Sequence, residues 1–116
     1  MPLTRSFKET VKERVQDDPA FRNALLAEGV DALLSGEVDV GKSIIRDFIN
    51  ATIGFQQLAE ETGTPSKSLM RMFGPTGNPS ARNLFLVISA LQRSSGTSLR
   101  VGVNAKTARS RTRKAA

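Results

Sequence analysis

The chain has 116 residues, of which 39% are apolar and 24% charged, values typical of one globular domain with a hydrophobic core. It contains no cysteine and no histidine, so disulfides, thiolate or imidazole metal ligands and the commonest general base are all missing. No apolar run approaches the roughly 20 residues of a membrane-spanning helix, and the N-terminus lacks the apolar core of a signal peptide. We therefore expect a cytoplasmic protein that is not an enzyme and that needs no cofactor, metal or membrane.

The net charge of +6 is distributed unevenly. The first 61 residues contain all 11 acidic residues and seven basic ones, which gives a net charge of −4. The remaining residues contain ten basic residues and no acid. A basic half is expected of a surface that binds a polyanion such as DNA, although a basic run can also be a solvated surface.

Two amphipathic helices are predicted at the start of the chain. From Thr4 to Gln16 an apolar side chain recurs every four residues among charged ones. Asp18 and Pro19 are typical of an N-cap and a first helical position, and Gly36 is predicted to end the second helix. We expect these helices to pack through Phe7, Val11, Val15, Phe21, Leu25, Leu26, Val30, Leu33 and Leu34.

A third helix is predicted from Asp39, which would cap it, to about Thr52, with Val40, Ile44, Ile45, Phe48 and Ile49 as its apolar face. Its start overlaps a match to the phosphate-loop pattern GxxxxGK[ST], because residues 36–43 read GEVDVGKS. Such a loop follows a buried strand, whereas here a helix is predicted, and Glu37 and Asp39 would repel phosphates. The chain contains no acidic residue after Glu61 that could coordinate Mg²⁺. Nucleotide binding is therefore only a weak alternative.

Residues 53–72, which read IGFQQLAEETGTPSKSLMRM, predict two short helices joined at Gly63. Glycine can adopt the left-handed conformation that a tight turn between two helices requires. Thr64 is the predicted N-cap of the second helix and Pro65 its first residue. We expect Leu69, Met70, Met72 and Phe73 to be its apolar positions. This pattern is typical of a helix-turn-helix.

The second of these helices is predicted to enter the major groove of DNA. Lys67 and Arg71 lie one turn apart on one face, and both residue types commonly bind O6 and N7 of guanine, so we expect them to contact base edges. Ser66 and Ser68 are expected to contact phosphate or base. Thr64, at the start of the helix, completes this predicted set.

The run LAEETGTPSKSLMRM, with Leu58, Ala59, Gly63 and Leu69 as fixed points, resembles the Xre/Cro-type helix-turn-helix of bacterial and phage repressors. The longer stretch through GNPSARNLFLVISAL resembles the HigA-type antidote regulators of toxin–antitoxin modules. The similarity covers residues 18–103.

This resemblance implies a sequence-specific repressor that binds double-stranded operator DNA as a homodimer, regulates its own operon and acts as the antitoxin of a cognate toxin. It also implies that Gln56 and Gln57 contact the DNA backbone. A stand-alone transcriptional regulator without a toxin partner is the alternative. A small basic toxin would be attracted to the acidic N-terminal half.

The C-terminal part is predicted to contain one further helix. Residues 74–79 are turn formers, which either make a plain turn or seat a DNA phosphate. Ser80 is predicted to cap a helix that ends at about Gln92 and whose core residues are Leu84, Phe85, Val87, Ile88 and Leu91. Residues 98–103 alternate as in a β-strand, which would pair with a second copy, pair with another protein or stay irregular. The dimer could be formed by this strand or by helices.

The predicted fold is all-α. Residues 1–17 form an N-terminal helix or arm, 18–97 a helix-turn-helix domain, 98–103 a strand and 104–116 a flexible basic tail, with five to six helices in total. The tail is expected to add DNA affinity without sequence preference through Lys106, Arg109, Arg111, Arg113 and Lys114.

Overall fold

The computed structural model describes residues 3–105, which form six α-helices and no β-strand. The helices are α1 (Leu3–Asp17), α2 (Pro19–Leu34), α3 (Val38–Ala51), α4 (Gly54–Thr62), α5 (Ser66–Met72) and α6 (Ala81–Ser95). The all-helical prediction is thereby confirmed. Among these residues, no helix is long and apolar enough to cross a membrane.

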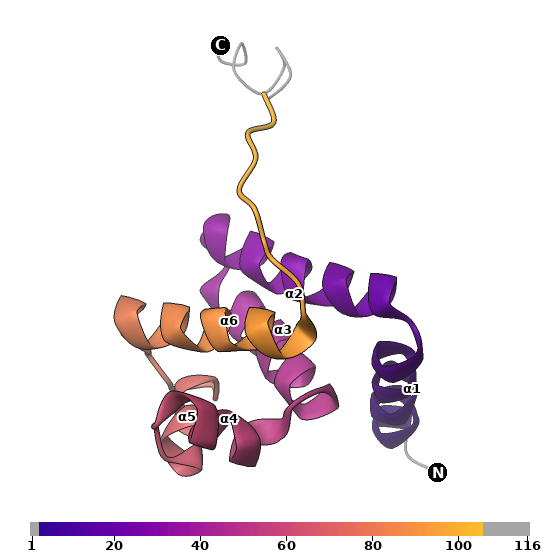
Figure 1. Ribbon diagram of the computed structural model, residues 1–116, viewed down its shortest axis with the longest axis horizontal. Coiled ribbons are helices and arrows are strands. Elements are labelled where there is room, and N and C mark those ends of the chain that lie inside the picture. The colour runs from indigo at the N-terminus through magenta and orange to yellow at the C-terminus, as the bar shows by residue number, and fades with distance from the viewer. Residues whose placement is uncertain (1–2, 106–116) are drawn as a thin grey trace.

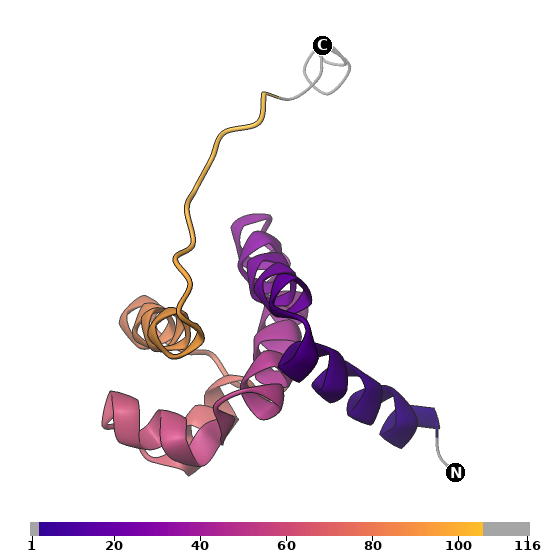
Figure 2. The same cartoon turned by 45° about the vertical axis from the view of Figure 1, so that its right-hand side comes forward.

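The helix α3 connects the two parts of the fold. It packs along α2 on one side and leads into α4, which contacts α5 and α6 (Figure 1). The helix α1 extends away from the other helices, as Figure 2 shows most clearly, and its buried Val15 contacts the body near the C-terminal end of the helix. The shared core contains Leu26, Ile45, Phe48, Ile49, Phe55, Leu58, Leu69, Phe73, Val87, Ile88, Ala90 and Leu91.

Two helix starts are set by the caps that the sequence predicts. A side-chain oxygen of Asp18 accepts a hydrogen bond from the N–H of Phe21 at 3.2 Å, and Pro19 follows as the first residue of α2. The hydroxyl of Ser80 accepts from the N–H of Asn83 at 3.1 Å and starts α6. These bonds satisfy N–H groups that have no partner within the helix.

Three predicted helix boundaries, two starts and one end, are wrong. The helix α3 begins at Val38, so Asp39 lies in its first turn and Glu37 is the N-cap. Pro65 is the N-cap of α5 because its ψ of 143° is extended, which places Thr64 outside the helix. The helix α6 continues to Ser95, since the left-handed residue that can end it is Gly96.

Four residues that the sequence predicts on the apolar faces of their helices are exposed: Leu34, Val40, Met70 and Phe85. Each lies beside, and not within, the buried stripe of its helix, because a helix of a small domain buries only the side that meets other elements. The side chains of Phe7 and Val11 lie outside the described residues.

The predicted strand at residues 98–103 is wrong for the single chain. Residues 98–105 leave the end of α6 as an irregular extended segment. Leu99 still packs against the core, and the later residues project from the helices (Figures 1 and 2). The backbone of this segment has no neighbouring strand among residues 3–105, and a strand needs a partner for its ladder of hydrogen bonds. The basic tail from residue 106 onward lies outside the described residues.

Candidate nucleic-acid interface

A tight turn at Gly63 joins α4 to α5. Gly63 has a φ of 74°, in the left-handed region, and its N–H donates to the carbonyl of Ala59 at 2.8 Å. The hydroxyl of Thr62 donates to the carbonyl of Leu58 at 2.8 Å and accepts from the N–H of Thr64 at 3.3 Å. A residue with a Cβ would be strained at position 63. The turn thus fixes the direction in which α5 leaves α4.

The short helix α5 has one buried and one exposed face. Leu69 and Phe73 insert into the core. Lys67, Met70 and Arg71 are exposed, and Lys67 and Arg71 lie one turn apart. Because the buried side chains fix the rotation of the helix about its axis, both cationic side chains are held toward solvent. This face can offer ammonium and guanidinium donors to the edges of bases.

The other predicted contact residues lie on α4, on α5 or in the turn between them. Thr64, Ser66 and Ser68 are partly exposed, at the turn and the flank of α5. Gln56 and Gln57 are exposed at the start of α4, where no side chain caps the helix. Uncapped N–H groups beside exposed amides form a surface that can donate hydrogen bonds to a phosphate oxygen.

Met70 lies on the exposed face of α5, although its apolar side chain predicts a buried position. Its exposed fraction is 50%. It lies three residues after Lys67, so helical spacing from Lys67 would have placed it near this face. An apolar side chain in the major groove can contact the C5 methyl group of thymine.

The loop after α5 folds back onto the end of that helix. The N–H of Gly74 donates to the carbonyl of Arg71 at 3.1 Å, and the N–H of Gly77 donates to the carbonyl of Gly74 at 3.1 Å. A Cβ at position 77 would collide with the carbonyl oxygens of Arg71 and Met72. The N–H groups of Gly74 and Gly77 are thus engaged by carbonyl oxygens of α5 and of the loop, which favours a plain turn over a phosphate-binding loop.

The residues GEVDVGKS do not form a phosphate-binding loop. Gly41, Lys42 and Ser43 lie within α3. The side chain of Lys42 points into the protein, where its Nζ donates to the carbonyl oxygens of Gly77 at 2.6 Å and Gly74 at 3.1 Å. The lysine that a phosphate loop would need is therefore bound to backbone oxygens.

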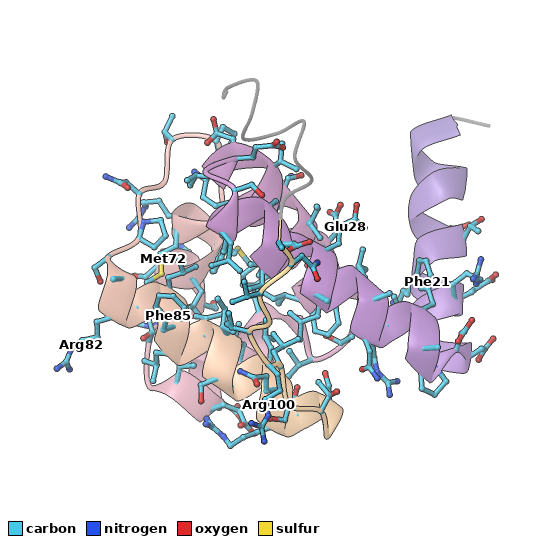
Figure 3. The ribbon with its side chains drawn as sticks, turned by 90° about the horizontal axis from the view of Figure 1, so that it is seen from above. Phe21, Glu28, Met72, Arg82, Phe85 and Arg100 are labelled. Carbon is cyan, nitrogen blue, oxygen red and sulfur yellow. The ribbon has the colours of Figure 1, made fainter. Side chains whose placement is uncertain are left out.

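Basic side chains continue beyond α5. Arg82, Arg93 and Arg100 are exposed, and Figure 3 shows Arg82 extending outward from the first turn of α6. The exposed acidic residues nearest in sequence to α5 are Glu60 and Glu61, at the end of α4. Among the described residues, the chain from α5 onward thus presents only positive charge.

Comparison of the chain with protein-family models, with curated proteins and with solved structures gave no match.

Proposed function

We propose that the protein is a sequence-specific DNA-binding transcriptional repressor in which α4 and α5 act as a helix-turn-helix. The observation that carries this proposal is the exposed pair Lys67 and Arg71 on the face of α5 opposite Leu69 and Phe73. A short helix with one apolar and one cationic face, preceded by a glycine turn, suits insertion into a major groove. The absence of acidic residues after Glu61 supports the same function.

In this mechanism Lys67 and Arg71 bind base edges, and each good contact contributes about 1–3 kcal/mol of discrimination against a wrong base. Ser66 and Ser68 contact phosphate or base. The exposed amides of Gln56 and Gln57 meet the phosphate backbone at the start of α4 and set the register of α5 on the duplex. Occupation of an operator beside the promoter then represses transcription.

The repressor is proposed to act as a homodimer, because two recognition helices can read half-sites about one helical turn apart. Two sets of exposed apolar residues are available for such an interface. Phe85 and Leu86 lie on α6, and Val101 and Val103 lie in the extended C-terminal segment. Both a helix-mediated and a strand-mediated dimer remain compatible with these positions.

We further propose that the repressor is the antitoxin of a toxin–antitoxin module. The observation that favours this role is the corner between α2 and α3, where apolar and acidic side chains are exposed together. A basic toxin with an apolar pocket would complement both the charge and the hydrophobicity of this corner. Its residues are Asp31, Leu34, Glu37, Val38, Asp39 and Val40.

The DNA-binding proposal is tested by titrating the protein with its own upstream duplex and with a scrambled duplex at two salt concentrations. The variant Lys67→Ala/Arg71→Ala should lose its preference for the native sequence while it keeps salt-sensitive affinity from other basic residues. The variant Lys12→Ala/Arg14→Ala removes the same charge from exposed positions of α1 and should keep the preference. Equal binding of both duplexes by the unmodified protein would contradict the proposal.

The antitoxin role is tested by co-expressing the chain with the product of an adjoining reading frame. If that product arrests growth, the native chain should relieve the arrest, and Leu34→Asp/Val40→Asp should relieve it less while binding DNA normally. The absence of a toxic product beside the gene would argue for a stand-alone regulator. Full relief by the variant would show that the toxin binds a surface other than this corner.

A further inference from the structure

We propose that Lys42 is a positioning residue for DNA recognition: its ammonium group fixes the loop that ends α5 and thereby sets how well α5 discriminates between DNA sequences. This inference rests on the proposed function. It assigns a role to Lys42, which is the one buried charged side chain among the residues whose side chains the structure describes. The role belongs to the ammonium group itself and not to the hydrophobic stem of the side chain.

The surroundings of Lys42 show what the ammonium does. Its exposed fraction is only 4%, and a buried ammonium is strongly unfavourable unless hydrogen bonds replace its water. The carbonyl oxygens of Gly77 and Gly74 supply these bonds at 2.6 and 3.1 Å. The carboxylate of Asp39 lies 3.6 Å away but is almost fully exposed, so solvent screens it. The two loop carbonyls are therefore the principal partners of the charge.

The loop connects Lys42 to the DNA-facing side of α5 through a short series of hydrogen bonds. The carbonyl of Gly74 accepts from Lys42 and also from the N–H of Gly77, while the N–H of Gly74 donates to the carbonyl of Arg71. Arg71 is one of the two proposed base-reading residues. A shift of the loop would thus be transmitted directly to the turn of α5 that carries Arg71.

The helix α5 depends on such external support. It has only seven residues and no side-chain cap at its start, and helices of this length are not stable on their own. A cation near its C-terminal end also interacts favourably with the helix dipole. Specific recognition requires side chains held within about 0.5 Å of their productive positions, whereas attraction to phosphates tolerates larger errors. Loss of the ammonium should therefore weaken discrimination more than general affinity.

The absence of cysteine from the chain allows a test that changes the ammonium and little else. Lys42→Cys can be alkylated in the unfolded state with 2-bromoethylamine, which rebuilds a lysine-length side chain ending in an ammonium. Alkylation with 1-bromopropane gives a side chain of the same length that ends in a methyl group. After refolding, both forms are titrated with the native upstream duplex and the scrambled duplex at two salt concentrations. Circular dichroism and thermal unfolding report on the fold of each form.

The aminoethyl form should discriminate between the duplexes as the unmodified protein does. The propyl form should lose about tenfold of its preference for the native duplex, as for the loss of one base contact, while its affinity for the scrambled duplex and its salt dependence stay unchanged. Val15→Ala in α1 serves as a control for lost stability, since Val15 is buried but lies outside the core cluster that contains Leu69 and Phe73, and this variant should keep the preference.

Gly77→Ala provides a second test that leaves all charges in place. The added Cβ must displace the loop from the carbonyl oxygens of Arg71 and Met72, so this variant should lose the preference as well. Full discrimination by the propyl form or by Gly77→Ala would overturn the proposal. So would a propyl form that fails to fold or that loses affinity for both duplexes equally, because Lys42 would then be a requirement of folding alone. If the unmodified protein shows no preference, the proposed function itself fails, and that outcome is recognised before any variant is compared.

Discussion

Gly41 of α3 lies so close to Leu33 of α2 that a Cβ at position 41 would stand 2.7 Å from both Cγ and Cδ2 of Leu33. The same Cβ would lie 3.0 Å from the carbonyl oxygen of Gly29, on the facing side of α2. Glycine at position 41 thus permits the close contact between α2 and α3, which is the most extensive helix contact of the fold. The phosphate-loop match in the sequence includes this glycine, but its role in the structure is packing.

Gly41→Ala should therefore destabilise the protein, although alanine is the better helix former. We expect a loss of about 1–3 kcal/mol in the free energy of unfolding, because the added methyl group overpacks the contact with Leu33. Urea denaturation followed by circular dichroism measures this loss. Gly102→Ala is a suitable control, since a Cβ at position 102 would meet no atom within 4 Å. A more stable Gly41→Ala variant would show that α2 and α3 can move apart at little cost.

Ser80→Ala should remove the cap of α6. The hydroxyl of Ser80 accepts from the N–H of Asn83, and the loss of such a cap typically costs about 0.5–2 kcal/mol. Ser80→Asp keeps an acceptor at the same position and should restore most of the stability. Thermal unfolding of the two variants gives the comparison, and equal destabilisation by both would mean that the bond to Asn83 contributes little.

If α5 is a recognition helix, Met70 should contact thymine methyl groups, because the side chain of Met70 is exposed on the same short helix as Lys67 and Arg71. Replacing thymine by uracil throughout the native duplex removes only the methyl groups. The unmodified protein should bind the uracil duplex several-fold more weakly, as expected for the loss of about 1 kcal/mol of apolar contact.

The variant Met70→Ala isolates the contribution of this side chain. It should bind the thymine and uracil duplexes with more nearly equal affinity than the unmodified protein does. If the variant is as sensitive to the methyl groups as the unmodified protein, Met70 does not contact them, and its exposure has another cause. Specific binding by α5 would not be affected by that result.

Gln92 should hold the start of the C-terminal segment against α6. Its Oε1 accepts from the N–H of Leu99 at 2.8 Å, and Leu99 packs against the core, whereas Arg100 is exposed. In Gln92→Ala the segment should open more often, so that trypsin cleaves after Arg100 faster. Cleavage after Arg93, inside α6, is the internal control and should change less. Unchanged cleavage after Arg100 would indicate that the packing of Leu99 is sufficient.

Local signals in the sequence determined the helices. Asp18 and Ser80 cap α2 and α6 as predicted, and Gly63 adopts the left-handed conformation expected between α4 and α5. These features depend on a few neighbouring residues, so the sequence suffices to predict them. The exposed positions of Lys67 and Arg71 follow for the same reason, since they lie opposite Leu69 on one short helix.

Only the tertiary structure decided which apolar and charged side chains are buried. Phe85 and Leu34 have exposed fractions of 59% and 65% although both match the helical spacing of core residues, while the charged Lys42 is buried. Burial depends on which elements from distant parts of the chain meet, and the carbonyl oxygens that bind Lys42 lie more than thirty residues after it. The same holds for residues 98–103, whose alternation predicts a strand, because a strand forms only where a second strand is present to pair with it.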